Sequence, residues 1–270
     1  MGRTNHKQEG LLMLAKRINQ LVVMFICMVV LVMQFNCIAN NKPELVLSWE
    51  FAEGKGNLIK DSSGNGYDGL MMGGRWVKSG KGYAVEWIDG SPGGITLYYE
   101  PYDKLNIDDV ITVEMWVKLT EFHEGDIYGD HRDCDFIAND GSWRIRIYPN
   151  GTLDVGICYG ENSSWIGLGA KGNLGKIPLN TWTHIAWSYD SETRAFYSYI
   201  NGKRYGRVLL PEYAKDFRLQ STSYCFAIRP DLTKSNGKKA DDNFIGAVTG
   251  IKVWKGAKSV FDLSYLSELQ

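Results

Sequence analysis

Hydrophobic and polar residues alternate in short runs over most of the chain after residue 40. The clearest run is 110–120, where every second position is apolar. The apolar positions are Ile111, Val113, Met115, Val117 and Leu119, and the polar positions between them are Thr112, Glu114 and Lys118. Because successive side chains of a strand point to opposite faces, this spacing predicts a strand with one buried face.

The same alternation predicts strands over residues 142–148, 182–189, 195–210 and 245–256. Asn201-Gly202 lies inside the third of these runs and is typical of a tight hairpin turn. About a dozen such runs with no helical pattern between them predict antiparallel pairing. Since so many apolar residues cannot leave a whole sheet face in water, we expect two stacked sheets in an all-β jelly roll. One helical turn is expected near Asp262–Leu269.

The first 39 residues have the layout of a secretory signal peptide. A basic stretch precedes the uncharged apolar run Leu21–Met33, and Cys37-Ile38-Ala39 resembles a small-x-small cleavage site. About 13 apolar residues are short for a membrane span, which needs about 20. We expect cleavage after Ala39 and a secreted, cell-surface or periplasmic protein. An uncleaved N-terminal anchor and a lipidated Cys37 are the alternatives.

Removal of the leader leaves one domain, residues 40–270, with a weak negative charge. The leader contains four of the 30 basic residues and one of the 31 acids, so the remaining chain carries about −4. No basic block is present, which argues against nucleic acid and anionic membrane surfaces as partners. We expect no membrane insertion of this domain.

Three cysteines remain in the domain: Cys134, Cys158 and Cys225. In an exported protein they allow one disulfide and one free thiol, and three separate buried side chains are an equally good interpretation. Their spacing does not match a zinc site.

Five stretches, read in order, resemble the bacterial laminin-G-like family, which has the concanavalin A-like lectin/glucanase fold. They are LSWEFAEGKGNLIKDSSGNGYDG, GYAVEWIDG with Asp89-Gly90, ITVEMWVK with Trp116, NTWTHIAWSYD followed by YSYINGK, and FIGAVTGIKVW. In the first stretch the matching positions are Trp49, Phe51, Glu53, Gly54, Asp61, Ser63, Gly64, Asn65, Asp68 and Gly69.

The resemblance implies a sandwich that binds glycans or extracellular protein partners, often together with calcium. One departure lies in the closing strand, where the family pattern has an acid and this chain has Val248-Thr249-Gly250. The resemblance therefore carries no role of that acid in a metal site or a turn over to this chain.

The turn DSSGNGYDG is the candidate calcium site. Asp61, Asn65 and Asp68 offer the hard oxygen ligands that calcium prefers, and backbone carbonyls can complete the shell. The alternative is a tight turn in which the Asp and Asn side chains bond to their own backbone.

The candidate ligand site combines a polar loop with nearby aromatic residues. Asp130, His131 and Asp133 lie in the acidic loop 121–135, which is long for a strand connection. Trp143, Tyr159 and Trp165 are candidates for stacking on sugar rings, and Trp165 follows turn-like sequence. A solvated loop and core aromatics are the alternative interpretations.

The sequence favours binding over catalysis. Hydrolases of this fold carry Glu-x-Asp-x-x-Glu or Glu-x-Asp-x-Glu on a strand, and neither pattern occurs here. His184, between Trp182 and Trp187, is expected to be a packed, hydrogen-bonded residue. We therefore expect a secreted, non-catalytic, lectin-like module. A polysaccharide hydrolase or lyase and a structural or adhesive envelope protein are the alternatives.

Overall fold

The computed structural model divides the chain into two compact units, Met1–Lys42 and Pro43–Gln270. The described residues are 16–25, 28, 42–80, 82–88, 94–97, 105, 107, 109–121, 134–139, 143–148, 150–159, 164–167, 175–215, 217, 219, 226–227 and 245–264. In the first unit, residues 16–25 and 28 are helical. No helix among the described residues combines the length and apolar character needed to cross a membrane. Cleavage of residues 1–39 stays a prediction.

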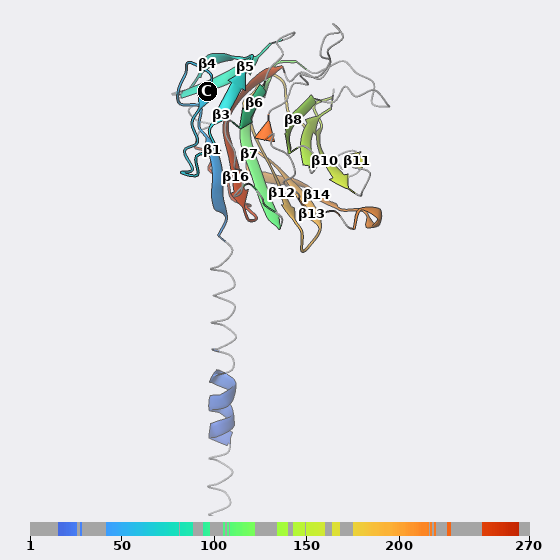
Figure 1. The fold of residues 1–270 in the computed structure, drawn as a ribbon. Helices are drawn as coiled ribbons and strands as arrows, with labels where there is room; N and C mark the ends of the chain where they lie inside the picture. Colours follow the sequence, from blue (N-terminus) through green and yellow to red (C-terminus); the bar gives the residue numbers. More distant parts are fainter. Residues whose placement is uncertain are drawn as a thin grey trace, which may run out of the picture. The chain divides into compact units, whose positions relative to one another are not determined.

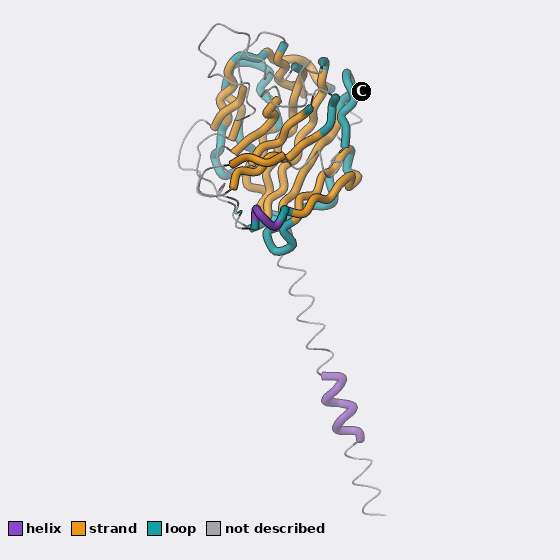
Figure 2. Tube along the Cα trace, turned by 90° about the vertical axis from the view of Figure 1, so that its right-hand side faces the viewer, coloured by secondary structure: helices purple, strands orange, loops and turns teal. Residues whose placement is uncertain are grey.

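Strands make up most of the described part of the second unit (Figures 1 and 2). Eight of them form one large antiparallel sheet in the order β14-β13-β12-β7-β16-β5-β4, and β1 also pairs with β16. Their bounds are β1 Glu44–Trp49, β4 Arg75–Ser79, β5 Gly82–Trp87, β7 Val110–Leu119, β12 Thr183–Asp190, β13 Ala195–Ile200, β14 Lys203–Leu209 and β16 Gly246–Lys255.

The remaining strands form two smaller antiparallel sheets, β11-β10-β9-β8-β15 and β2-β3-β6. They meet where β15 contacts β6. Their bounds are β2 Leu58–Ile59, β3 Gly69–Met72, β6 Gly94–Leu97, β8 Cys134–Asn139, β9 Trp143–Ile147, β10 Leu153–Tyr159, β11 Ser164–Gly167 and β15 Phe226–Ala227. Figure 1 shows β8, β10 and β11 grouped apart from β7, β12, β13 and β14. The prediction of a two-sheet antiparallel sandwich is confirmed.

The core lies between the sheets and follows the predicted alternation. All five apolar positions of β7 are buried, as are Ile185, Trp187 and Tyr189 of β12. Ile145 and Ile147 of β9 belong to the same cluster. The inner face of the large sheet therefore packs against the smaller sheets, and the alternate residues of β7 and β12 point to its outer face.

The predicted hairpin turn joins β13 to β14. Asn201 and Gly202 both have positive φ, 48° and 71°, as a two-residue turn of the primed type requires. The backbone N–H of His184 donates to Asn201 Oδ1 at 2.9 Å, and Asn201 N–H donates to the His184 carbonyl at 2.8 Å. The turn thus fixes the hairpin against the end of β12.

The structure corrects one local prediction and describes part of another. Residues 262–264 of the expected helical turn Asp262–Leu269 are not helical, and the rest of that turn lies outside the described residues. A short 3-10 helix, Glu212–Ala214, instead follows β14. Trp165, expected in a turn, lies in β11, where its backbone pairs with Cys158 of β10. The Asn-Ser-Ser sequence before Trp165 favoured a turn by composition, and strand pairing prevails over that local preference.

Candidate functional site: a polar pocket on the outer face of the large sheet

The outer face of the large sheet carries a second, smaller cluster of packed residues. Residues 256–264, which we call the strap, leave the end of β16 and cover part of this face. Phe261 of the strap packs against His184 and Tyr199, with ring centroids 5.1 and 4.9 Å apart. The backbone N–H of Lys258 donates to Thr112 Oγ1 at 3.0 Å. Because of this cover, outward-facing side chains of β7 and β12 are buried rather than solvated.

A buried carboxylate, Glu114 of β7, is the centre of a hydrogen-bond network under the strap. Glu114 is 4% exposed. Its Oε1 accepts from Trp254 Nε1 at 2.6 Å and from Lys258 Nζ at 2.5 Å, and its Oε2 lies 3.0 Å from His184 Nε2. The Lys258 ammonium also lies 4.2 Å from the Trp254 ring centroid. Three donors from different elements therefore compensate one buried charge. We call these four residues the Glu114 cluster.

The network determines the ionisation of Glu114. Burial alone raises the pKa of this carboxyl, but the hydrogen bonds and charges of His184 and Lys258 outweigh burial and hold the pKa below its ordinary value. Glu114 is therefore a carboxylate at neutral pH.

The carboxylate in turn orients the imidazole of His184. Since a carboxylate only accepts hydrogen bonds, the facing Nε2 atom carries a proton. His184 is 1% exposed, and among the described residues its Nδ1 atom has no hydrogen-bond partner. The expectation that His184 is a packed, hydrogen-bonded residue is confirmed.

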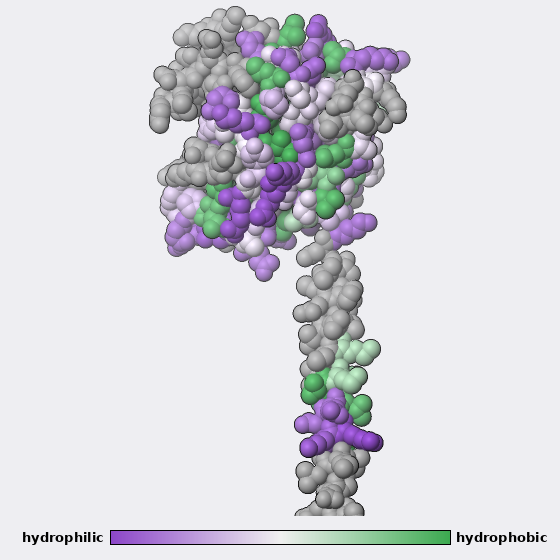
Figure 3. Space-filling model, turned by 180° about the vertical axis from the view of Figure 1, so that it is seen from behind, coloured by the Kyte–Doolittle hydropathy of each residue, from purple (hydrophilic) through white to green (hydrophobic). Residues whose placement is uncertain are grey.

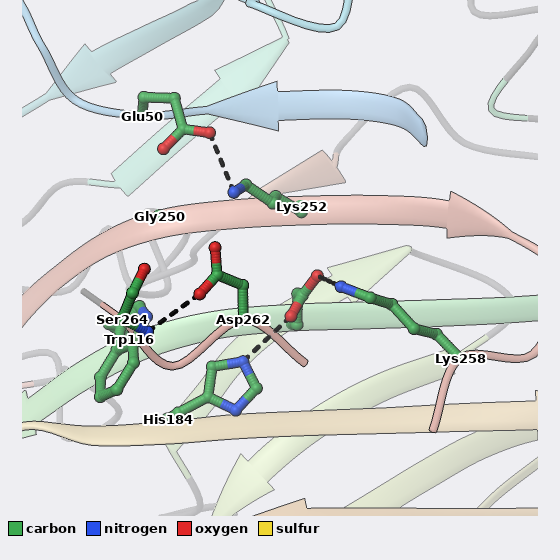
Figure 4. Close-up of a pocket in the computed structure, with 9 residues that line it drawn as sticks. Glu50, Trp116, His184, Gly250, Lys252, Lys258, Asp262 and Ser264 are labelled. Carbon is green, nitrogen blue, oxygen red and sulfur yellow. Dashed lines mark hydrogen bonds and ion pairs between the residues drawn. The ribbon is translucent and has the colours of Figure 1, made fainter. Parts of the chain in front are cut away.

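A pocket of about 190 Å³ opens beside this network. His184 and Trp116 lie at its floor, while Lys252 and Asp262 approach from other elements (Figure 4). Gly250 also lines it, at a bulge in β16 where two residues oppose Met115 of β7. Gly250 has φ +61°, and a Cβ there would lie 3.2 Å from Trp116 Cδ1. The glycine both permits the bulge and keeps space open next to Trp116.

Two further polar groups form the walls. Glu50, just after β1, accepts from Lys252 Nζ at 3.0 Å. On the strap, the backbone N–H of Ser264 donates to Asp262 Oδ1 at 2.9 Å, and this hydrogen bond lowers the pKa of the Asp262 carboxyl. The pocket thus presents carboxylate acceptors and ammonium donors side by side.

The predicted calcium residues do not line this pocket and belong to a dense hydrogen-bonded turn. Asp61 Oδ1 accepts from the backbone N–H groups of Ser48 and Ser63, both at 2.9 Å. Asp61 Oδ2 accepts from Ser63 Oγ at 2.7 Å and from the Tyr67 N–H at 3.0 Å. Each oxygen of this carboxylate therefore already accepts two protein donors.

The other two candidate ligands are similarly engaged. Asp68 Oδ1 accepts from the Asp61 N–H at 2.9 Å, and Asp68 Oδ2 pairs with Lys60 Nζ at 2.6 Å. Asn65 Nδ2 donates to the Val46 carbonyl at 2.8 Å. No group of three His, Cys, Asp or Glu residues suited to a metal ion occurs among the described residues. These hydrogen bonds are those of the alternative interpretation, a structural turn, and calcium binding here stays a prediction.

The predicted ligand site is only partly described. Asp130, His131 and Asp133 lie outside the described residues. Trp143, Tyr159 and Trp165 belong to β9, β10 and β11, which are adjacent strands of one sheet, but their side chains lie outside the described part. The aromatic half of the prediction therefore falls on one sheet, and its role in binding stays a prediction.

Sequence reasoning missed the Glu114 pocket because its members are far apart along the chain. The register of the β12–β7 pair brings them together, since His184 pairs with Trp116 and Ala186 pairs with Glu114. The departure from the family pattern at Thr249 has a structural explanation, since this fully buried side chain donates to the Tyr83 carbonyl at 2.9 Å.

A family model of laminin-G type, described as the concanavalin A-like lectin/glucanases superfamily, matches residues 89–263. The chain belongs to this superfamily. Curated protein sequences give no match. The matched range includes β7, β12 and β16, so the floor of the Glu114 pocket lies within the part that defines the superfamily domain.

Solved structures show the same fold at low sequence identity. The binding domain of Paraclostridial Mosquitocidal Protein 1 matches with a TM-score of 0.58 at 15% identity, covering 80% of this chain and 49% of that one. Domain 4 of AbnA, an extracellular arabinanase of Geobacillus stearothermophilus solved with arabinotriose, matches with a TM-score of 0.53 at 20% identity. The match covers 85% of this chain and 100% of that one. The binding domain of botulinum neurotoxin DC, solved with rat synaptotagmin II, matches with a TM-score of 0.55 at 16% identity. The match covers 84% of this chain and 52% of that one. This chain thus spans about half the length of the mosquitocidal-protein and neurotoxin chains that it matches.

Proposed function

We propose that this protein is a non-catalytic binding module that recognises carbohydrate through the pocket on the outer face of its large sheet. The observation that carries the proposal is the pocket itself, in which carboxylates, ammonium groups and a buried Trp–His floor lie within one small space. Sugar hydroxyls both donate and accept hydrogen bonds, so they match a lining that offers both kinds of partner.

The described surface supports a polar ligand. In the view from behind, hydrophilic and hydrophobic side chains are mixed over the coloured part of Pro43–Gln270, and no broad hydrophobic area stands out there (Figure 3). Large exposed apolar patches are typical of protein docking surfaces. The coloured part of this face therefore offers no broad apolar area for a protein partner.

The ionisation of the pocket argues against a hydrolase. Glycoside hydrolysis uses a general acid whose pKa is raised so that it stays protonated. In Glu114 and Asp262 the pKa is shifted downward, and Glu114 is also occupied by three donors. Both are therefore poorly suited to donate a proton, and the exposed Asp262 is the one that can accept a hydrogen bond from a ligand.

The structural neighbours are consistent with binding. One was solved with arabinotriose and another with a synaptotagmin, and three are named as binding domains, one of a mosquitocidal protein and two of botulinum neurotoxins. At these identities they establish the fold, and they show that this fold serves ligands of both kinds in other proteins.

A glycan array tests the proposal. We expect the purified protein to bind one or a few glycans, and Lys252→Met to abolish that binding, because Lys252 is a donor in the pocket wall. Arg75→Ala, an exposed position on β4, is the matched control and should bind as the wild type does. Release of sugar from a bound glycan would identify a hydrolase instead.

The proposal includes export. The layout of residues 1–39 motivates it, and intact-mass analysis of the protein recovered from medium and membrane fractions tests it. A mass starting at Asn40 supports a cleaved leader. Retention of residues 1–39 in the membrane fraction supports an anchor, and a lipid adduct at Cys37 supports a lipoprotein.

A further inference from the structure

The dimensions of the pocket limit what it can hold. Its volume of about 190 Å³ is below the range of about 300–1,000 Å³ that is usual for sites of drug-sized ligands. The Glu50–Lys252 pair lies on one side of it and the strap on the other, so the pocket is bounded on two sides. A single sugar ring fits such a space, and a run of several sugars in the middle of a chain does not.

The charges of the pocket lining further restrict the kind of ligand that fits. The carboxylates are Glu50, Glu114 and Asp262, and the ammonium groups are Lys252 and Lys258. Glu50 pairs with Lys252 at 3.0 Å, and Glu114 with Lys258 at 2.5 Å, which leaves no excess cation. A uronate or sulfate ester placed here would meet three carboxylates, so a neutral sugar is favoured.

One wall of the pocket belongs to the strap. Lys258, Asp262 and Ser264 all line the pocket, and Lys258 reaches Glu114 from the strap. The strap is held by Phe261, which packs on the outer cluster, while its Val260 side chain is 81% exposed. The site is therefore incomplete unless the strap is seated.

We propose that this pocket binds the terminal residue of a neutral glycan chain and that the C-terminal strap is a working wall of the site. The inference rests on the proposed function and goes further, because it specifies a chain end, a neutral sugar and a dependence on residues 256–264. A sugar bound here contacts the sheet and the strap together, so binding holds the strap in place.

Chain-end recognition is tested with oligosaccharide ladders. Arabino-, xylo-, manno- and cello-oligosaccharides of one to six residues are titrated into the purified protein by calorimetry. We expect affinity to level off after one or two residues, and the matching monosaccharide to compete. Affinity that keeps rising with length would overturn chain-end recognition but leave the binding module intact. Preference for uronate-bearing oligosaccharides would overturn the neutral ligand.

Two strap variants test the wall. Asp262→Asn removes a carboxylate from the pocket and should weaken binding at least tenfold, and Val260→Ser, on the exposed side of the same strap, should bind as the wild type does. Hydrogen exchange should show slower exchange at residues 257–264 when the sugar is bound. Unchanged binding by Asp262→Asn, or unchanged exchange, would place the ligand elsewhere. Failure to bind any glycan on the array would instead overturn the proposed function itself.

Discussion

Two carboxylates in this sandwich, Asp61 and Glu114, are each surrounded by donors, but they are satisfied in opposite ways. Asp61 accepts from donors 2, 6 and 13 residues away, and three of its four hydrogen bonds come from backbone N–H groups. Glu114 accepts from side chains 70, 140 and 144 residues away. The first carboxylate organises a turn, whereas the second joins three separate elements beside a pocket.

The difference shows why one site was visible in the sequence and the other was not. The Asp-x-Ser-Gly-Asn spacing places acids and small residues close together, so it attracts attention as a ligand set. The structure uses the same groups as hydrogen-bond acceptors for their own backbone. None of the partners of Glu114 lies near it in sequence, since the nearest, His184, is 70 residues away. A polar residue becomes part of a pocket only when register and the strap bring its partners together.

The largest effect is expected from Glu114→Ala. Removing the carboxylate leaves the Lys258 ammonium and the Trp254 N–H without their acceptor, which should lower the free energy of unfolding by about 3 kcal/mol. Urea titration followed by tryptophan fluorescence measures this. Glu114→Gln keeps an acceptor and should lose less. A loss no larger than that of the surface variant Arg75→Ala would show that the cluster does not stabilise the fold.

A smaller loss is expected from Asp61→Ala. The change removes four hydrogen bonds, but Asp61 is only half-buried, so water can replace part of the lost acceptor and about 2 kcal/mol is expected. The same urea titration applies. Asp61→Asn, which keeps one carbonyl oxygen, is the control and should fall between the alanine variant and the wild type. A loss larger than that of Glu114→Ala would reverse the comparison between the two carboxylates.

Acid should remove the contribution of the Glu114 cluster. The pKa of Glu114 in the folded protein lies below its ordinary value of 4.5, so the stabilisation is complete above that value and is lost as the pH falls through the folded pKa. The difference in unfolding free energy between wild type and Glu114→Gln should be constant above about pH 5.5 and shrink below about pH 4.5. A difference that grows on acidification would contradict the direction of the shift.

The smallest effect is expected from calcium. A metal that binds the folded state raises the melting temperature by mass action. Because both oxygens of Asp61 already accept from protein donors, calcium must displace some of these donors, so the predicted site should raise the melting temperature in calcium relative to chelator only modestly. A rise that Asp61→Ala abolishes would support the predicted metal site at Asp61, Asn65 and Asp68, and equal melting temperatures would leave Asp61 as a turn residue only.

The local sequence pattern predicted the strands, their buried face and the hairpin turn, because these depend on residues close together in the chain. The alternation in β7 and β12 identified the buried face, and Asn201-Gly202 identified a turn whose φ values only small or amide-bearing residues adopt easily. The local pattern could not predict which residues far apart in sequence contact each other. Nothing near Lys258 indicates that its ammonium lies on a β7 carboxylate, and nothing near Gly250 reveals the bulge that keeps space open beside Trp116.

The position of β16 has a consequence for how the chain is assembled. This strand, Gly246–Lys255, pairs with β7 on one edge and with β5 and then β1 on the other, so it lies in the middle of the large sheet although it follows all the other described strands in sequence. Until β16 is synthesised, β1, β5 and β7 each have an unpaired edge of the kind on which chains aggregate. Synthesis of Gly246–Lys255, rather than of any earlier described strand, is therefore the step that allows the large sheet to close.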